Sequence, residues 1–176
     1  MKPQLSHVGI YVSDSDTMIR FYQAVLELTV TDRGLSSSAQ QPITFMSAHA
    51  EQHHQLVLVH GRAPASPSTV NQLSFKVGSL AELRAVAAKV TARGIKMRQT
   101  SHGNAWSVYF PDPEGNQVEI YLDTPWHVAQ PHGDPIDFSL SDSEICAQTE
   151  QRVRADPTFK PRAEREVELA QLLNAR

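Results

Sequence analysis

The sequence predicts an α+β fold in which two strand-helix-strand-strand-strand repeats form one curved, eight-stranded cup, followed by a helical C-terminal extension. The main observation is an internal repeat. Residues 70–77 match residues 5–12 position by position, with His7 opposite Gln72, an offset of 65 residues (72 minus 7). Each match is followed by a capped helical pattern and then by three strand patterns. Two units this small, joined by a short linker, are expected to pack side by side, with their sheets curving around a shared cleft.

The first repeat is expected to span residues 4–60. Residues 5–12 alternate apolar with small or polar side chains, as a half-buried strand does. Residues 13–16 (Ser-Asp-Ser-Asp) offer N-caps for a helix. The buried face of that helix has helical spacing and contains Met18, Phe21, Tyr22 and Val25. Further strands are expected at residues 28–31, where Asp32-Arg33-Gly34 ends the strand, and at residues 43–47 and 55–60.

The second repeat is expected to span residues 70–123, after a linker at residues 61–69 that contains two prolines. Ser79 is the expected N-cap of its helix, and Gly94 the residue that stops it. The buried stripe of this helix is formed by Leu80, Leu83, Val86, Ala87 and Val90. Strands are expected near residues 95–99, 105–110 and 117–122, with a turn at Asp112-Pro-Glu-Gly-Asn between the last two.

The two repeats predict one domain over residues 1–123, and residues 124–176 form a separate extension. The first part of the extension is irregular and rich in proline. Residues 141–154 and 161–175 show two helical patterns with mixed charges, as expected of helices that pack on the sheets or on a partner chain. Two-fold dimers are the commonest oligomers of soluble proteins, so a homodimer is expected.

Composition excludes several classes of protein. The chain has 176 residues, 40% of them hydrophobic and 20% charged, with a net charge of −3. A nucleic-acid binder would need a basic excess, and the apolar runs are too short for a membrane span or a signal peptide. A single cysteine, Cys146, cannot form an internal disulfide or a thiolate metal cluster. A cytoplasmic protein is therefore expected. Neither a phosphate-binding glycine loop nor a serine or cysteine nucleophile motif is found.

The repeat, the Asp112-Pro-Glu-Gly-Asn turn and the following Val118-Glu-Ile-Tyr segment together resemble the vicinal oxygen chelate superfamily. This superfamily includes glyoxalase I, bleomycin-resistance proteins and type I extradiol dioxygenases. The resemblance covers residues 4–123. Residues 51–58, with the pair His53-His54, and residues 102–110 (His-Gly-Asn-Ala-Trp-Ser-Val-Tyr-Phe) are similar to segments of the extradiol dioxygenases. The C-terminal segment that starts Asp123-Thr124-Pro125-Trp126 resembles that of small one-domain, biphenyl-2,3-diol dioxygenase-like members.

The resemblance implies a non-haem Fe(II) site built from two histidines and one glutamate, with open positions for a catechol and dioxygen. Carried over to this sequence, the ligands are His7, Glu119 and, where the family has its second histidine, Gln72. A carboxamide oxygen is a weaker ligand than imidazole, so Mn, Ni, Co or Zn remain alternatives to iron. His7 could instead be a hydrogen-bonded core residue. Glu119 could pair with an arginine such as Arg98 or make a structural hydrogen bond. Gln72 could be a solvent-facing or hydrogen-bonded strand residue.

The resemblance implies three further site residues. His54 corresponds to the histidine that takes a proton from the catechol, for which imidazole is suited because its pKa lies near neutral pH. Tyr109 corresponds to a tyrosine that donates a hydrogen bond to a substrate oxygen, and His102 shapes the cleft. The alternatives are an exposed histidine at position 54 and a plain core tyrosine at position 109. His53 is expected to point to the other face of the strand.

These expectations together imply an extradiol ring-cleaving enzyme of aromatic catabolism that acts on a catechol-type substrate and dioxygen. Two alternatives stay open. The scaffold could be a non-enzymatic protein that sequesters an aromatic ligand, because the second histidine is replaced. It could also be a lyase or isomerase that uses another divalent metal at the same residues.

Overall fold

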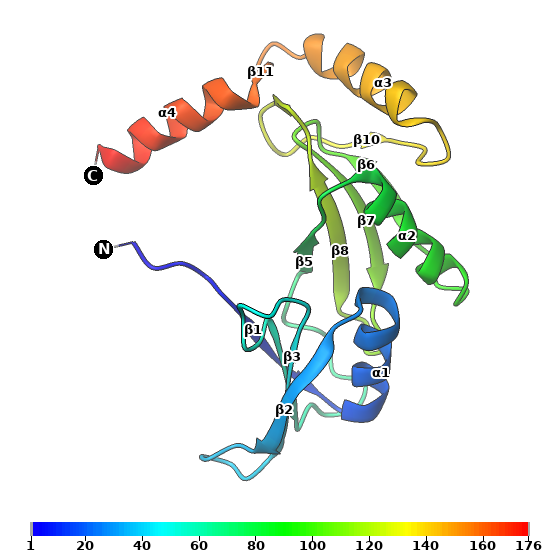
Figure 1. The fold of residues 1–176 in the computed structure, drawn as a ribbon, viewed down its shortest axis with the longest axis vertical. Helices are drawn as coiled ribbons and strands as arrows, with labels where there is room; N and C mark the ends of the chain where they lie inside the picture. Colours follow the sequence, from blue (N-terminus) through cyan, green and yellow to red (C-terminus); the bar gives the residue numbers. More distant parts are fainter. Residues whose placement is uncertain (1, 176) are drawn as a thin grey trace. The chain divides into compact units, whose positions relative to one another are not determined.

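The computed structural model describes residues 2–175 and contains both predicted repeats (Figure 1). The α+β class is confirmed. The first repeat consists of β1 (Val8–Val12), α1 (Ser15–Leu26), β2 (Thr29–Leu35), β3 (Pro42–Ser47) and β4 (Leu56–His60). The second consists of β5 (Leu73–Lys76), α2 (Leu80–Thr91), β6 (Arg98–Ser101), β7 (Ala105–Pro111) and β8 (Gln117–Asp123). The C-terminal segment adds β9 (Trp126–His127), β10 (Asp134–Pro135), α3 (Asp142–Arg154), β11 (Lys160–Pro161) and α4 (Arg162–Asn174).

The chain divides into two compact units. The first unit contains residues 1–71 and 111–117, and the second contains residues 72–110 and 118–176. The turn between β7 and β8 therefore belongs to the first unit, although the rest of the second repeat lies in the second unit. The joining of both sheets into one cup and the predicted domain limits (1–123 and 124–176) stay predictions.

The first unit has a four-stranded sheet in the order β1-β4-β3-β2, with β1 and β4 parallel and the other pairs antiparallel. Two strand limits differ from the prediction. The ladder between β1 and β4 starts at Val8 opposite Leu56, so His7 lies just before the strand and is exposed. Asp32-Arg33-Gly34 does not end β2, because these residues continue the pairing with β3 after a bulge at Thr31. At Asp32-Arg33-Gly34 the pairing with β3 overrides the local turn signal.

Helix α1 begins at the predicted caps. The Asp14 side chain accepts a hydrogen bond from the Thr17 amide, which satisfies one free donor of the first turn. The apolar side of α1 packs into the core of the first unit. The fully buried residues of this core include Val12, Met18, Tyr22, Val25, Met46 and Leu58.

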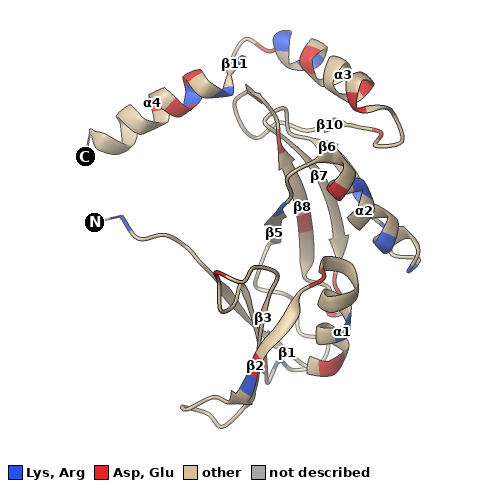
Figure 2. Ribbon diagram, in the orientation of Figure 1, with Lys and Arg blue, Asp and Glu red and all other residues tan. Residues whose placement is uncertain are grey.

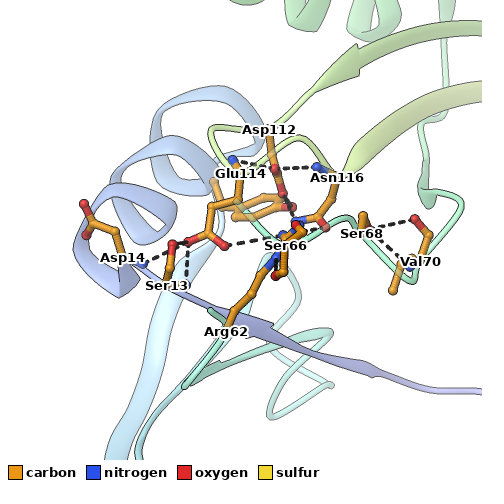
Figure 3. Close-up of polar contacts among 10 residues, drawn as sticks. Ser13, Asp14, Arg62, Ser66, Ser68, Val70, Asp112, Glu114 and Asn116 are labelled. Carbon is orange, nitrogen blue, oxygen red and sulfur yellow. Dashed lines mark hydrogen bonds and ion pairs between the residues drawn. The ribbon is translucent and has the colours of Figure 1, made fainter. Parts of the chain in front are cut away.

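The Asp112–Asn116 turn is confirmed and is anchored in the first unit by polar contacts (Figure 3). Glu114 Oε1 accepts hydrogen bonds from the Ser13 amide at 2.7 Å and from the Ser13 hydroxyl at 2.9 Å. Arg62 Nη1 donates to Asn116 Oδ1 at 3.1 Å and lies 3.4 Å from Glu114 Oε2. Both members of the Arg62–Glu114 ion pair are about nine-tenths buried, at 11% and 10% side-chain exposure. This pair and the Ser13 contacts hold the turn on the first repeat.

The second unit has a five-stranded sheet in the order β10-β6-β7-β8-β5, in which β5 and β8 run parallel. Here too, strand pairing makes two strands start at other residues than predicted. β6 begins at Arg98 opposite Tyr109, rather than at residue 95 as predicted. β5 begins at Leu73, so Gln72 directly precedes the strand. Ser79 caps α2, and Gly94 follows the helix with a left-handed φ of 68°, as predicted for a stop signal.

Within the second unit, the extension packs on the other elements through α3, while α4 buries none of its side chains. The Arg84 guanidinium on α2 donates to the carbonyls of Phe138 and Leu140, each at 2.7 Å. The indole N–H of Trp106 on β7 donates to Thr149 Oγ1 on α3 at 2.9 Å. Acidic residues lie in the first turn of α3 and basic residues in its last turn, which complements the helix dipole (Figure 2).

The predicted ends of both helices of the extension agree with the structure to within one residue. The short strands β9, β10 and β11 were not predicted. No helix formed by residues 2–175 has the length and apolar character needed to cross a bilayer.

Candidate functional site

Glu119 is a buried carboxylate at the centre of β8 in the second unit. It is 7% exposed and lies between Val118 and Ile120, which are 0% and 1% exposed. A buried carboxylate needs compensating hydrogen bonds. Three side chains supply them, so the predicted alternative in which Glu119 pairs with Arg98 is not what the structure shows.

Ser74 on the neighbouring strand β5 and Gln72, which directly precedes that strand, both contact Glu119. Gln72 Nε2 donates to Glu119 Oε2 at 2.8 Å, and the Ser74 hydroxyl donates to the same oxygen at 2.6 Å. The parallel pairing of β5 and β8 places Ser74 opposite Glu119. Gln72 lies two residues earlier, and side chains two apart share one face of an extended segment. The structure thus brings together two of the three residues predicted as metal ligands.

Tyr109 and His102 extend this contact into a chain of hydrogen bonds. The Tyr109 hydroxyl donates to Glu119 Oε1 at 2.5 Å. His102 Nε2 lies 2.7 Å from the same hydroxyl, and His102 Nδ1 lies 2.7 Å from the backbone carbonyl of His132. We call these four groups, from Glu119 to the His132 carbonyl, the relay.

The hydrogen-bond partners fix the position of two protons in the relay. The His132 carbonyl can only accept, so the proton between it and His102 must be on Nδ1. The single phenolic proton of Tyr109 can serve Glu119 or His102, but not both. The Tyr109 proton is directed to Glu119, and His102 Nε2 lies on the other side of the same hydroxyl.

Tyr109 is electrostatically tuned by its surroundings. Burial raises the pKa of Tyr109 to about 12, and the hydrogen bond to Glu119 and its charge act in the same direction. The Arg98 guanidinium lies over the ring, 4.2 Å from the ring centroid, and opposes this increase in pKa. Tyr109 is thus a neutral hydrogen-bond donor at neutral pH, and its role as a donor requires no ionisation.

The remaining predicted site residues, His7 and His54, lie in the first unit. Their ring centroids are 4.2 Å apart, and Ser6 Oγ lies 2.9 Å from His7 Nδ1. The His54 ring also packs edge-on against Phe45, with a centroid distance of 5.0 Å. The pKa of His54 is lowered, first by partial burial and then by the charges of His7 and His53. His54 is therefore neutral at neutral pH and can accept a proton.

One prediction about this pair of neighbours is wrong. His53 was expected to point away from His54, but their Nδ1 atoms are 2.8 Å apart. The alternation of side chains applies only inside a strand, and β4 starts later, at Leu56. The two histidines lie in the turn before it.

Two contributors to the site were missed at the sequence level. Ser74 could have been found, because it lies two residues after Gln72 on the same strand pattern. The His132 carbonyl has no sequence signal, since it is a backbone atom of a loop far along the chain. Within residues 2–175, no set of three or more His, Cys, Asp or Glu side chains has a geometry suited to one metal ion.

The oxygens of the second unit nonetheless fit a hard divalent cation. Glu119 Oε2 accepts two hydrogen bonds, but Oε1 accepts only one and keeps a lone pair. The amide nitrogen of Gln72 donates to Glu119, which leaves the amide oxygen of Gln72 able to coordinate a metal ion. A carboxylate oxygen and an amide oxygen are ligands that Fe(II) and Mn(II) accept.

Comparison with known proteins agrees with this chemistry at the level of the family. The chain is 27% identical over 128 residues to biphenyl-2,3-diol 1,2-dioxygenase 3 of Rhodococcus globerulus, which covers 69% of this chain and 64% of that protein. It is 23% identical over 124 residues to the uncharacterized protein YwbC of Bacillus subtilis, covering 69% of this chain and 98% of that protein. The chain thus spans less than two thirds of the dioxygenase.

Solved structures share the fold. A glyoxylase/bleomycin resistance protein/dioxygenase domain from Frankia sp. EAN1pec matches with a TM-score of 0.61 at 21% identity, covering 70% of this chain and all of that one. The fosfomycin resistance protein FosX of Listeria monocytogenes, solved with Mn(II), matches with a TM-score of 0.55 at 19% identity, covering 70% and 95%. The model of one protein family matches residues 4–120. The chain therefore belongs to the Glyoxalase/Bleomycin resistance protein/Dioxygenase superfamily.

Proposed function

We propose that the protein is an extradiol ring-cleaving dioxygenase that acts on a catechol-type aromatic with a non-haem Fe(II) centre. The observation that carries this proposal is the relay around Glu119. A buried carboxylate, a tyrosine held neutral and a histidine with a fixed Nδ1 proton are in direct contact. The similarity to a biphenyl-2,3-diol dioxygenase supports the choice of reaction.

The ligand set of this proposal is His7, Gln72 and Glu119. When bound, Fe(II) supplies Lewis acidity toward the two catechol oxygens and an electron path to dioxygen. The protein residues do the rest. His54 accepts a catechol proton, for which its lowered pKa is suited. Tyr109 orients the substrate through its hydroxyl, and His102 keeps that hydroxyl in place through Nε2.

Further parts of the proposal concern the setting of the enzyme. We place it in the cytoplasm and in aromatic catabolism, because the sequence resembles ring-cleaving enzymes and carries one cysteine. A homodimer and a domain boundary near residue 123 belong to the same proposal.

One observation favours a second candidate function, a cup that binds an aromatic ligand without turning it over. Gln72 stands where the dioxygenases have a histidine, and its side-chain nitrogen donates a hydrogen bond to Glu119. A third candidate is a lyase or isomerase with Mn, Ni, Co or Zn, and the FosX structure with Mn(II) supports that metal class.

Elemental analysis of anaerobically purified protein separates these candidates. Near-stoichiometric iron that disappears in His7→Ala and Glu119→Gln, followed by ring cleavage of 2,3-dihydroxybiphenyl, is the expected result. His60→Ala is the matched control, because it removes an exposed histidine at the end of β4. Another metal lost in the same two variants would favour the lyase or isomerase. Protein that stays free of metal after reconstitution with Fe(II) would refute the dioxygenase and leave the binding cup.

A further inference from the structure

The second unit contains a pocket that neither the family match nor the proposed mechanism assigns. It has a volume of about 500 Å³ and lies between β6 and residues 131–135 of the extension. Its polar lining includes Arg98, Thr100, His102, His132 and Asp134. His102 also belongs to the relay, so the pocket adjoins the candidate catalytic residues.

Arg98 is the cationic group of this pocket. Its guanidinium stacks on Tyr109 and donates from Nη1 to Thr100 Oγ1 at 2.5 Å. Among the described residues 2–175, the arginines in ion pairs with carboxylates are Arg62, Arg84, Arg154, Arg162 and Arg165, and Arg98 is not one of them. Stacking and one hydrogen bond fix the plane of the guanidinium and leave its other N–H donors available. A fixed guanidinium fork matches the two oxygens of a carboxylate.

Asp134 determines which anion fits best. Its Oδ2 lies 3.2 Å from His132 Nε2, so this carboxylate already has a partner on the pocket wall. A pocket with one arginine and one nearby aspartate repels a dianion more strongly than a monoanion. A carboxylate is therefore favoured over a phosphate.

We propose that this pocket binds the carboxylate of a small organic acid and that Arg98 is the residue that recognises it. Together with the proposed function, on which this step rests, carboxylate binding at this pocket makes a catechol with an attached carboxylate the preferred substrate class. The aromatic ring would then lie toward Tyr109 and the acid group toward Arg98. The extension contributes one wall of the pocket through residues 131–135, so it takes part in substrate selection.

Binding of benzoate to the metal-free protein tests the pocket without requiring any enzymatic activity. In an NMR titration of ¹⁵N-labelled protein, benzoate is expected to shift the amide signals of residues 98–102 and 131–135, and the neutral benzamide is not. Arg98→Gln is expected to weaken benzoate binding about tenfold, as expected for loss of a charge-assisted contact. Lys96→Gln, which removes the same charge from an exposed residue outside the pocket, is expected to change it less than twofold.

Two further measurements can overturn the assignment. Asp134→Asn removes a like charge and is expected to tighten benzoate binding about threefold. Weaker binding of benzoate by Asp134→Asn would refute the assignment, because Asp134 would then bind a cation and not repel the anion. Inorganic phosphate is expected to bind more weakly than benzoate, and tighter binding of phosphate would refute carboxylate recognition. So would a protein that gives the same response to benzoate and benzamide.

Turnover distinguishes failure of the pocket from failure of the proposed function. In Fe(II)-loaded protein, the ratio of kcat/KM for 3,4-dihydroxybenzoate over catechol is expected to fall about tenfold in Arg98→Gln. Benzoate binding through Arg98 with no ring cleavage would refute the function and leave the pocket. Ring cleavage of both catechols without preference, together with no benzoate binding, would refute the pocket and leave the function.

Discussion

Replacement of Asp112 by alanine is expected to destabilise the protein by about 4 kcal/mol. Asp112 is 4% exposed, and its carboxylate accepts four hydrogen bonds in the first unit. Oδ1 accepts from the amides of Glu114 and Asn116, both at 2.9 Å. Oδ2 accepts from the Tyr22 hydroxyl at 2.9 Å and from Asn116 Nδ2 at 2.7 Å. Figure 3 shows how these contacts converge on the turn.

The size of the destabilisation by Asp112→Ala follows from the buried hydrogen-bond donors that lose their acceptor. Tyr22 is 0% exposed and Asn116 is 3% exposed, so water cannot replace the lost acceptor at either side chain. An unsatisfied buried donor costs about 1–3 kcal/mol, and two of them cost about 4 kcal/mol. Tyr22→Phe removes one donor together with its need for a partner and is expected to cost less, about 1.5 kcal/mol. Combining both changes should therefore cost less than the sum.

Urea unfolding followed by circular dichroism measures these differences, with Asp32→Ala as the control. Asp32 is exposed on β2, and its replacement is expected to change the free energy of unfolding by less than about 0.5 kcal/mol. Stability of Asp112→Ala within 1 kcal/mol of the parent would refute the reasoning. Strict additivity of the Asp112 and Tyr22 changes would show that their contact carries no energy.

Three other predictions concern the second unit. Gly103→Ala is expected to destabilise the protein by more than about 2 kcal/mol in the same urea assay. The φ of Gly103 is +73°, and a Cβ at this position would lie 2.5 Å from Val128 Cγ2. An unchanged free energy of unfolding would contradict this. Tyr109 has a native pKa of about 12, above its unfolded value near 10, so its contribution to stability is complete below pH 10 and is lost as the pH rises toward 12. Tyr109→Phe should remove that loss from the stability profile between pH 10 and 12, and an unchanged profile would refute the shift. Gln72→His replaces an amide oxygen by imidazole and is expected to raise Fe(II) affinity about tenfold in a chelator competition; unchanged affinity would mean that position 72 does not contact the metal.

Short-range signals in the sequence were sufficient to identify the helices and the repeat. Asp14 and Ser79 cap α1 and α2 as predicted, because a side-chain cap acts within three residues of its own position. The same holds for Gly94 after α2 and for the turn that starts at Asp112. In each case the residues that make the contact are neighbours in the chain.

Strand limits depended on partners that are distant in the chain. β6 begins at Arg98 because Tyr109 lies opposite it, and the residues before it have no such partner in the ladder. β2 runs through a local turn signal because β3 pairs with it on both sides of a bulge. A β-strand ends where its neighbour ends, and the local sequence cannot contain that information.

The candidate site likewise has a part that the sequence predicted and a part that only the tertiary structure revealed. The residue types His102, Tyr109 and Glu119 were predicted from the sequence through a family resemblance. Only the tertiary structure showed that they form one relay, that Gln72 donates to Glu119, and that a loop carbonyl at His132 fixes the His102 proton. The sequence by itself determined which chemical groups are available and which local elements carry them. Their order in the sheet and the contacts of the extension decided which groups touch, because these contacts join residues 7 to 47 positions apart.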